Sequence, residues 1–313
     1  MIWLIFRMRD YNHLIEHLRK LKTEQINKNT LDIDRLSPLK IVKKINEEDK
    51  TVAFAVEKQL PQIAKTAEVF AATLKNGGRV IYIGAGTSGR LGVLDAAECP
   101  PTFNTEPQQI VGVISGGYDT LVLSQEGVED RQHEAIADLK RIELDKNDFV
   151  IGLAASRRTP YTLAGLTYAQ KIGCKTAFIV CNKIDDSALA DMKVDSLIEL
   201  DVGPEVITGS TRMKSGTAQK MTLNMISTTA MILLGKTYGN LMIDLQANSE
   251  KLAARSRKIL MDIFSISLEE AEKLINQAEG SVKTAIVMKQ HSCDLKTARK
   301  KLQKANGFIS QIS

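Results

Sequence analysis

From residue 79 to residue 200, short runs of β-branched and other apolar residues alternate with segments of helical character. Segments such as 126–140 and 163–172 have the mixed polar and apolar pattern of surface helices. Strands that alternate with helices are typical of a parallel sheet that is covered by helices on both faces. The sequence therefore predicts an α/β fold around a five-stranded parallel sheet, with strands at 79–83, 110–114, 149–154, 176–180 and 196–200.

Both flanks of this region are predicted to be helical. Apolar residues recur at three- and four-residue spacing over 40–46 and 52–74, and Asn76-Gly77-Gly78 would end the second helix. A long helix is predicted over 210–235, and helix starts at Ser267 and Asp294 indicate that the tail is helical too. We predict three sections: a helical N-terminal section over 1–60, the α/β domain over 61–235 and a small C-terminal helical subdomain over 236–313.

The composition is that of an ordinary globular protein, with 43% hydrophobic residues, 25% charged residues and a net charge of +5. The basic segment over 296–304 has no interleaved aromatic residues, so we predict a solvated helix face and no nucleic-acid partner. The four cysteines and four histidines are scattered and lack the spacing of metal ligands, so no metal site is predicted.

Two observations bear on membranes and targeting. No window reaches the run of about 18 apolar residues that is needed to cross a membrane. The apolar run near the start, Ile2 to Phe6, is shorter than the apolar region of a secretory signal peptide. We therefore predict a cytoplasmic protein without a membrane partner.

The loop after the first predicted strand, Gly84 to Arg90, is rich in glycine and precedes a helix. Gly86 lets the backbone approach a ligand, the helix start offers free N–H groups, and Thr87 and Ser88 add hydroxyl donors. Glycines at 84, 86 and 89 also match the spacing of a dinucleotide loop, which is a weak signal alone. Because Ser115-Gly-Gly follows the second strand in place of a ribose-binding acid, we predict a monophosphate rather than a dinucleotide.

Two further polar segments follow later strands. Ser156, Arg158 and Thr159 follow the third strand, just before a helix with an early proline, and form a second candidate anion-binding loop. The segment 203–220 carries one acid, three basic residues and five hydroxyl groups directly after the fifth strand. Long polar loops usually carry function, and we predict Glu205, Ser210 and Lys214 as further substrate-binding residues.

These segments resemble one known family. Residues 84–92, 94–101 and 203–220 are similar to motifs of the N-acetylmuramic acid 6-phosphate etherases, which are sugar isomerase (SIS) domain proteins related to the glucokinase regulatory protein. The resemblance covers about residues 20–313 and implies a flavodoxin-like αβα sandwich. It also implies a carbon–oxygen lyase without metal or redox cofactor, which removes D-lactate from the sugar phosphate in peptidoglycan recycling.

By this resemblance, two carboxylates carry the chemistry, with Glu98 as the acid and Glu129 as the base. Spacing alone would assign Glu129 to a solvated polar helix. The chain departs from the family at two positions: Arg157 stands where glycine is usual, and so does Asn104. If position 157 needs a positive φ, arginine there would be strained, whereas asparagine tolerates that conformation.

Two other functions are compatible with this pattern. An aldose–ketose isomerase would use the same fold and the same proton abstraction at C2, although the 203–220 segment and the context of Glu98 favour the etherase. A non-catalytic sugar-phosphate regulator is disfavoured because both Glu98 and Glu129 are present.

The spacing of Ser88 and Glu98 predicts something about assembly. Ten residues of continuous helix span about 15 Å, which is too far for one hexose phosphate to contact both side chains easily. Either Gly92 breaks the helix, or Glu98 reaches into the site of a neighbouring subunit. We expect a two-fold homodimer with composite sites.

Overall fold

The structure is a computed structural model that describes residues 11–182, 193–245 and 249–312. The run Ile2 to Phe6, on which the signal-peptide argument rests, lies outside these residues.

A five-stranded parallel sheet forms the centre of the molecule. The strand order is β2-β1-β3-β4-β5, which is the flavodoxin-like order. Every strand falls within one residue of its predicted bounds, so the predicted α/β class and sheet are confirmed. The strands are β1 (Val80–Gly84), β2 (Ile110–Ile114), β3 (Phe149–Ala154), β4 (Lys175–Val180) and β5 (Ser196–Glu199).

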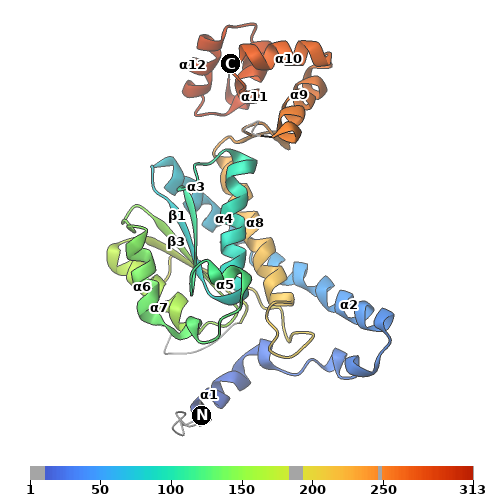
Figure 1. The fold of residues 1–313 in the computed structure, drawn as a ribbon, viewed down its shortest axis with the longest axis vertical. Coiled ribbons are helices and arrows are strands. Elements are labelled where there is room, and N and C mark those ends of the chain that lie inside the picture. The colour runs from blue at the N-terminus through green and yellow to red at the C-terminus, as the bar shows by residue number, and fades with distance from the viewer. Residues whose placement is uncertain (1–10, 183–192, 246–248, 313) are drawn as a thin grey trace.

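Helices cover both faces of the sheet, as Figure 1 shows. Successive residues of β1 alternate between two cores because strand side chains point to opposite faces. Tyr82 packs in a core with Phe70 and Ile226, whereas Ile81 packs on the other side with Leu139. The first face is covered by α3 (Leu60–Lys75), α4 (Gly86–Phe103) and α8 (Lys214–Leu233), and the second by α6 (Gln132–Arg141) and α7 (Pro160–Ile172).

The N-terminal section comprises α1 (Tyr11–Lys20), the 3-10 turns η1 (Lys22–Glu24), η2 (Lys28–Thr30) and η3 (Ile33–Arg35), and α2 (Pro38–Glu57). The prediction of one helix over 52–74 is wrong, because α2 ends at Glu57 and α3 begins at Leu60. Pro61 explains the break: proline has no N–H to donate and its ring clashes with the preceding turn, but it is tolerated in a first turn. In Figure 1, α2 extends away from the sheet.

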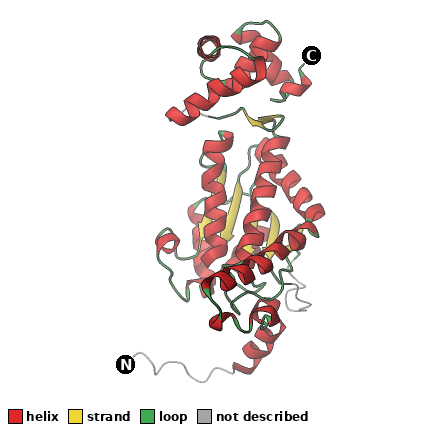
Figure 2. Ribbon diagram, turned by 90° about the vertical axis from the view of Figure 1, so that its right-hand side faces the viewer, coloured by secondary structure: helices red, strands yellow, loops and turns green. Residues whose placement is uncertain are grey.

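The C-terminal section has a core of its own, which includes Leu260, Ile275 and Ile286. A short hairpin, β6 (Thr237–Tyr238) and β7 (Leu241–Met242), precedes it (Figure 2). Ser267 forms the predicted capping box with Glu270. The helices are α9 (Glu250–Phe264), α10 (Leu268–Gln277), α11 (Val282–Gln290) and α12 (Leu295–Lys304), followed by the turn η6 (Ile309–Gln311). The section boundaries at residues 60 and 235 stay predictions.

Within the described ranges, each helix is too short or too polar to traverse a bilayer.

Candidate functional site

The strand order reverses between β1 and β3, and ligands of open parallel sheets bind beyond the strand ends at such a point. A pocket of about 290 Å³ lies here. It is lined by Thr23, Glu24, Ala85, Gly86, Thr87, Ser88, Arg90, Ser115, Thr120, Ser124, Gln125, Glu126, Val128, Glu129, Ala155, Ser156, Thr159, Gly209 and Thr211. The structure thus brings together six of the predicted site residues, namely Gly86, Thr87, Ser88, Glu129, Ser156 and Thr159.

The first turn of α4 forms one side of this pocket. Gly86 has φ +53, a left-handed conformation that glycine adopts without strain. The N-cap residue Ala85 makes no side-chain hydrogen bond, so the first N–H groups of α4 have no capping side chain. Such a helix start, with its positive dipole end, is suited to an anion. The buried Ser88 hydroxyl makes a 2.9 Å hydrogen bond to Oε1 of Gln219 on α8.

The start of α7 forms the opposite side of the pocket. Its N-cap residue Thr159 also makes no side-chain cap bond, and Pro160 occupies the first turn. Two helix starts without side-chain caps therefore face one pocket, which is an arrangement suited to a phosphate. Arg157 is not among the described residues with positive φ, so the strain considered for this position does not arise. Its guanidinium lies 3.6 Å from Oε1 of Glu199.

Glu129 lies on the separate 3-10 turn η4 (Val128–Asp130), not on a helix over 126–140 as predicted. Gly127, with φ +80, precedes the turn, and α6 begins only at Gln132. The Ser115 hydroxyl donates a 2.6 Å hydrogen bond to the Val128 carbonyl and so ties η4 to the end of β2. No sequence signal indicates this contact of Ser115, which lies in the segment that speaks against a dinucleotide site.

Glu98 does not line the same pocket. The helix α4 runs unbroken from Gly86 to Phe103, so the alternative of a break at Gly92 is wrong. A Cβ at Gly92 would lie 2.8 Å from Leu153 Cδ1 and 2.9 Å from Tyr82 Cβ, so this glycine allows the helix to pack closely on the sheet. Glu98 instead lines a second hollow of about 210 Å³ between α4 and α8. The helix ends at Asn104, which adopts the left-handed conformation with φ 52.

Glu205 and Lys214 are buried at the start of α8 rather than in the pocket wall. The Glu205 carboxylate accepts hydrogen bonds from the backbone N–H groups of Lys214 and Ser215, at 2.8 and 2.9 Å, where the helix dipole favours an anion. The Lys214 ammonium lies 2.8 Å from Oε2 of Glu48. Ser210 adjoins Gly209 and Thr211, which do line the pocket. The predicted contacts of these three residues with substrate stay predictions, and α8 starts at Lys214 rather than 210.

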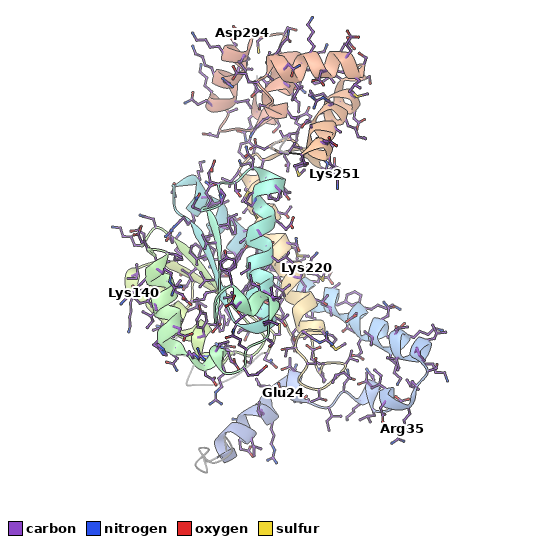
Figure 3. All side chains as sticks on the ribbon, viewed as in Figure 1. Glu24, Arg35, Lys140, Lys220, Lys251 and Asp294 are labelled. Carbon is purple, nitrogen blue, oxygen red and sulfur yellow. The ribbon has the colours of Figure 1, made fainter. Side chains whose placement is uncertain are left out.

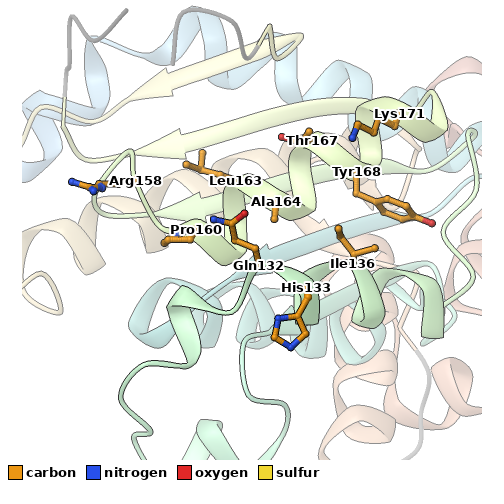
Figure 4. Close-up of a pocket in the computed structure, with 10 residues that line it drawn as sticks. All are labelled: Gln132, His133, Ile136, Arg158, Pro160, Leu163, Ala164, Thr167, Tyr168 and Lys171. Carbon is orange, nitrogen blue, oxygen red and sulfur yellow. The ribbon is translucent and has the colours of Figure 1, made fainter. Parts of the chain in front are cut away.

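A larger groove of about 750 Å³ lies between α6 and α7, with Arg158 at one end (Figure 4). Its walls are largely apolar, including Ile136 and Leu163, and none of the described residues that line it has a carboxylate. We therefore assign the site to the smaller pocket, which has the glycine-rich helix start and a carboxylate. Arg158 faces the groove and not that pocket.

The pocket also contains residues that the sequence alone does not indicate. Glu24 on η1 is one, and its carboxylate lies so close to Gly209 that a Cβ there would be 3.0 Å from Oε2. The other missed side chains include Thr120 and Thr211. Among the described residues, no three His, Cys, Asp or Glu side chains come together as a metal site would require.

Comparisons with known proteins agree with this geometry. Residues 62–170 match the family model of the glucokinase regulatory protein N-terminal SIS domain. An N-acetylmuramic acid 6-phosphate etherase from Geobacillus thermodenitrificans is 48% identical over 296 residues, which cover 95% of this chain and 98% of the relative. The chain belongs to this etherase family. Etherases from Clostridium beijerinckii and Bacillus cytotoxicus are 50% and 49% identical, with 94% of this chain and 96% and 99% of the relatives covered.

Proposed function

We propose that this chain cleaves the D-lactyl ether of N-acetylmuramic acid 6-phosphate to give N-acetylglucosamine 6-phosphate and D-lactate. The chain is a member of the etherase family, and one observation carries this proposal. Beyond β1 and β3, one pocket brings together two helix starts without side-chain caps and the carboxylate of Glu129. The phosphate binds to the starts of α4 and α7, next to Thr87, Ser156 and Thr159.

The reaction needs one base and one acid. In the open-chain sugar, the C1 aldehyde acidifies the hydrogen at C2, and Glu129 removes it as a proton. The C3–O bond then breaks, Glu98 donates a proton to the ether oxygen, and lactate leaves an unsaturated aldehyde behind. Water adds its hydroxyl to C3 and its hydrogen to C2, so the net change is hydrolysis of the ether. Each acid or base contributes about 10²–10⁴-fold to such a rate.

The separation of the two carboxylates is explained by a homodimer with composite sites. Because α4 is continuous, Glu98 lies ten residues along the helix from Ser88 and lines a different hollow. A two-fold partner can bring its own Glu98 to the pocket that holds the phosphate. Exposed apolar side chains support an interface: Leu94 beside Glu98 is 51% exposed, and Phe54 on α2 is 66% exposed.

A phosphorylated amino sugar is an intracellular metabolite, so we assign this activity to the cytoplasm and to cell-wall recycling. The substrate is a small sugar phosphate, and neither a nucleic acid nor a membrane is part of this proposal.

Incubation of the pure protein with N-acetylmuramic acid 6-phosphate tests the function. We expect equimolar D-lactate and N-acetylglucosamine 6-phosphate, and much slower turnover of the sugar without its phosphate. An aldose–ketose isomerase would release no lactate and would convert an aldose 6-phosphate into its ketose. A regulator would bind the sugar phosphate without turnover.

A further inference from the structure

The hollow that contains Glu98 also contains a lysine with no assigned role. It lies between α4 and α8, and its wall includes Leu94 and Glu98 from α4 and Lys220 and Asn224 from α8. Figure 3 shows Lys220 on α8. Both Lys220 and Asn224 are exposed, so a ligand that enters the hollow meets an ammonium group and an amide side by side with the carboxyl group of Glu98.

Lys220 makes no ion pair with the part of the chain that the structure describes. Its ammonium has no carboxylate within 4 Å among the described residues. The buried acid of this hollow, Asp95, is already hydrogen-bonded by the Tyr82 hydroxyl at 2.8 Å and the Ser227 hydroxyl at 3.0 Å. Burial raises the pKa of Asp95 above its ordinary value, although these hydrogen bonds and the charge of Lys220 oppose the increase. Lys220 is therefore available to an anion that comes from outside the chain.

The substrate of the proposed reaction supplies such an anion in this place. In a lactyl ether, the carbon that bears the ether oxygen also bears the carboxyl group, so the carboxylate carbon is two bonds from that oxygen. If Glu98 protonates the ether oxygen, the lactyl carboxylate must lie in or beside the hollow of Glu98. A carboxylate that leaves water needs a cation or hydrogen-bond donors to replace its hydration.

We propose that the ammonium of Lys220, together with the side-chain amide of Asn224, binds the lactyl carboxylate of the substrate. This assignment rests on the function proposed above. It makes Lys220 the residue that gives specificity for an ether that bears a carboxylate. Since Lys220 and Glu98 line the same hollow of one chain, both reach a given substrate from the same subunit, and in a composite site this is the partner of the subunit that holds the phosphate. A 6-phosphate sugar without the lactyl group gains no binding energy from Lys220. The aldose and ketose phosphates that an isomerase converts should therefore bind less tightly than the lactyl ether.

The test compares two ligands that differ only in the lactyl group. In the Glu129→Gln background, titration calorimetry measures the Kd of N-acetylmuramic acid 6-phosphate and of N-acetylglucosamine 6-phosphate, with and without Lys220→Met. We expect Lys220→Met to weaken binding of the lactyl ether about 10- to 100-fold, as for loss of a charge-assisted hydrogen bond. Binding of N-acetylglucosamine 6-phosphate should stay within about twofold. Lys220→Arg should retain most of the affinity, and kcat/KM of the Lys220→Met enzyme should fall by a similar factor.

Lys65→Met is the matched control, because it removes an exposed lysine of α3 away from the hollow. An equal loss of affinity for both ligands would show that Lys220 stabilises the fold and does not bind the lactyl carboxylate. Unchanged affinity for the lactyl ether would show that another group binds that carboxylate. Either result overturns this proposal while the wild-type protein still releases lactate. A wild-type protein that releases no lactate overturns the proposed function itself, and this inference with it.

Discussion

Glu48 joins the N-terminal section to the start of α8 through a buried ion pair. Its carboxylate accepts hydrogen bonds from Lys214, at 2.8 Å, and from Asn27 and Asn29, at 2.8 and 2.7 Å. Burial alone would raise the pKa of Glu48, but these hydrogen bonds prevail and lower the pKa below its ordinary value of 4.5. The charged form of Glu48 is therefore favoured by folding.

Replacement of Glu48 by Gln should lower the free energy of unfolding at neutral pH by about 3–5 kcal/mol, because the buried Lys214 would lose its counter-charge. Because folding lowers the pKa of Glu48, the ionised carboxylate stabilises the protein fully above pH 4.5. This stabilisation is lost as the pH falls through the pKa of Glu48 in the folded protein. The difference between wild type and variant in urea unfolding should thus be constant well above pH 4.5 and shrink below it. Glu47→Gln, which breaks only an exposed pair with Lys50, should change stability by about 0–1 kcal/mol. A similar loss in both variants would contradict this account.

Glu98→Gln and Glu129→Gln should each lower kcat by about 10²–10⁴-fold and leave the thermal unfolding transition nearly unchanged. Exchange of the C2 hydrogen in deuterated water separates their roles, because it needs the base and not the acid. The exchange should be lost in Glu129→Gln and largely kept in Glu98→Gln. Asp130→Asn is the control, since Asp130 is exposed on the same turn and does not line the pocket. Equal exchange in the two glutamate variants would contradict the assignment of acid and base.

Among the elements, α4 connects the proposed phosphate-binding pocket with Glu98. Its close approach to the sheet depends on Gly92, where a Cβ would lie under 3 Å from atoms of Leu153 and Tyr82. Gly92→Ala should therefore lower the free energy of unfolding by about 1–3 kcal/mol through overpacking, despite the better helix propensity of alanine. Gly216 of α8 is the control, because a Cβ there would have no neighbour nearer than 3.5 Å. Gly216→Ala should change stability by less than about 1 kcal/mol, and urea unfolding of both variants decides the matter.

The elements also show what a sequence can reveal about this fold. The strands were predictable because each is an apolar run of nearly the right length between turn residues, and burial on both faces makes the pattern plain. The loops of Gly86 and Ser156 were predictable as well, since parallel strands place their carboxyl ends at one edge. The turn that carries Glu129 was not predictable. It is positioned by the hydrogen bond from the Ser115 hydroxyl to the Val128 carbonyl, and no local sequence pattern indicates that these two residues pair.

At the scale of the whole molecule, the two proposed catalytic carboxylates lie in separate cavities of one chain. One chain has the pocket lined by Glu129 and, separately, the hollow lined by Glu98 and Lys220. The extended α2 in Figure 1 carries Leu39, Val42 and Phe54, which are 63%, 56% and 66% exposed. Such exposed apolar surface is characteristic of an interface, so we expect a dimer in sedimentation at assay concentration.

Composite sites make a quantitative prediction for mixed dimers. Glu98→Gln alone and the double variant Ser156→Ala, Thr159→Ala should each be nearly inactive, because the first lacks the acid and the second lacks hydroxyl donors at the phosphate. In a mixed dimer, one site combines the intact phosphate loop of one chain with the intact Glu98 of the other, and the second site carries both defects. Half of the dimers in an equimolar, fully exchanged mixture are mixed, so about a quarter of wild-type activity should return in a two-fold dimer. Differently tagged subunits report the exchange independently of activity. Mixed dimers that form but remain inactive, or a chain that sediments as a monomer while it releases lactate, would mean that Glu98 acts within its own subunit.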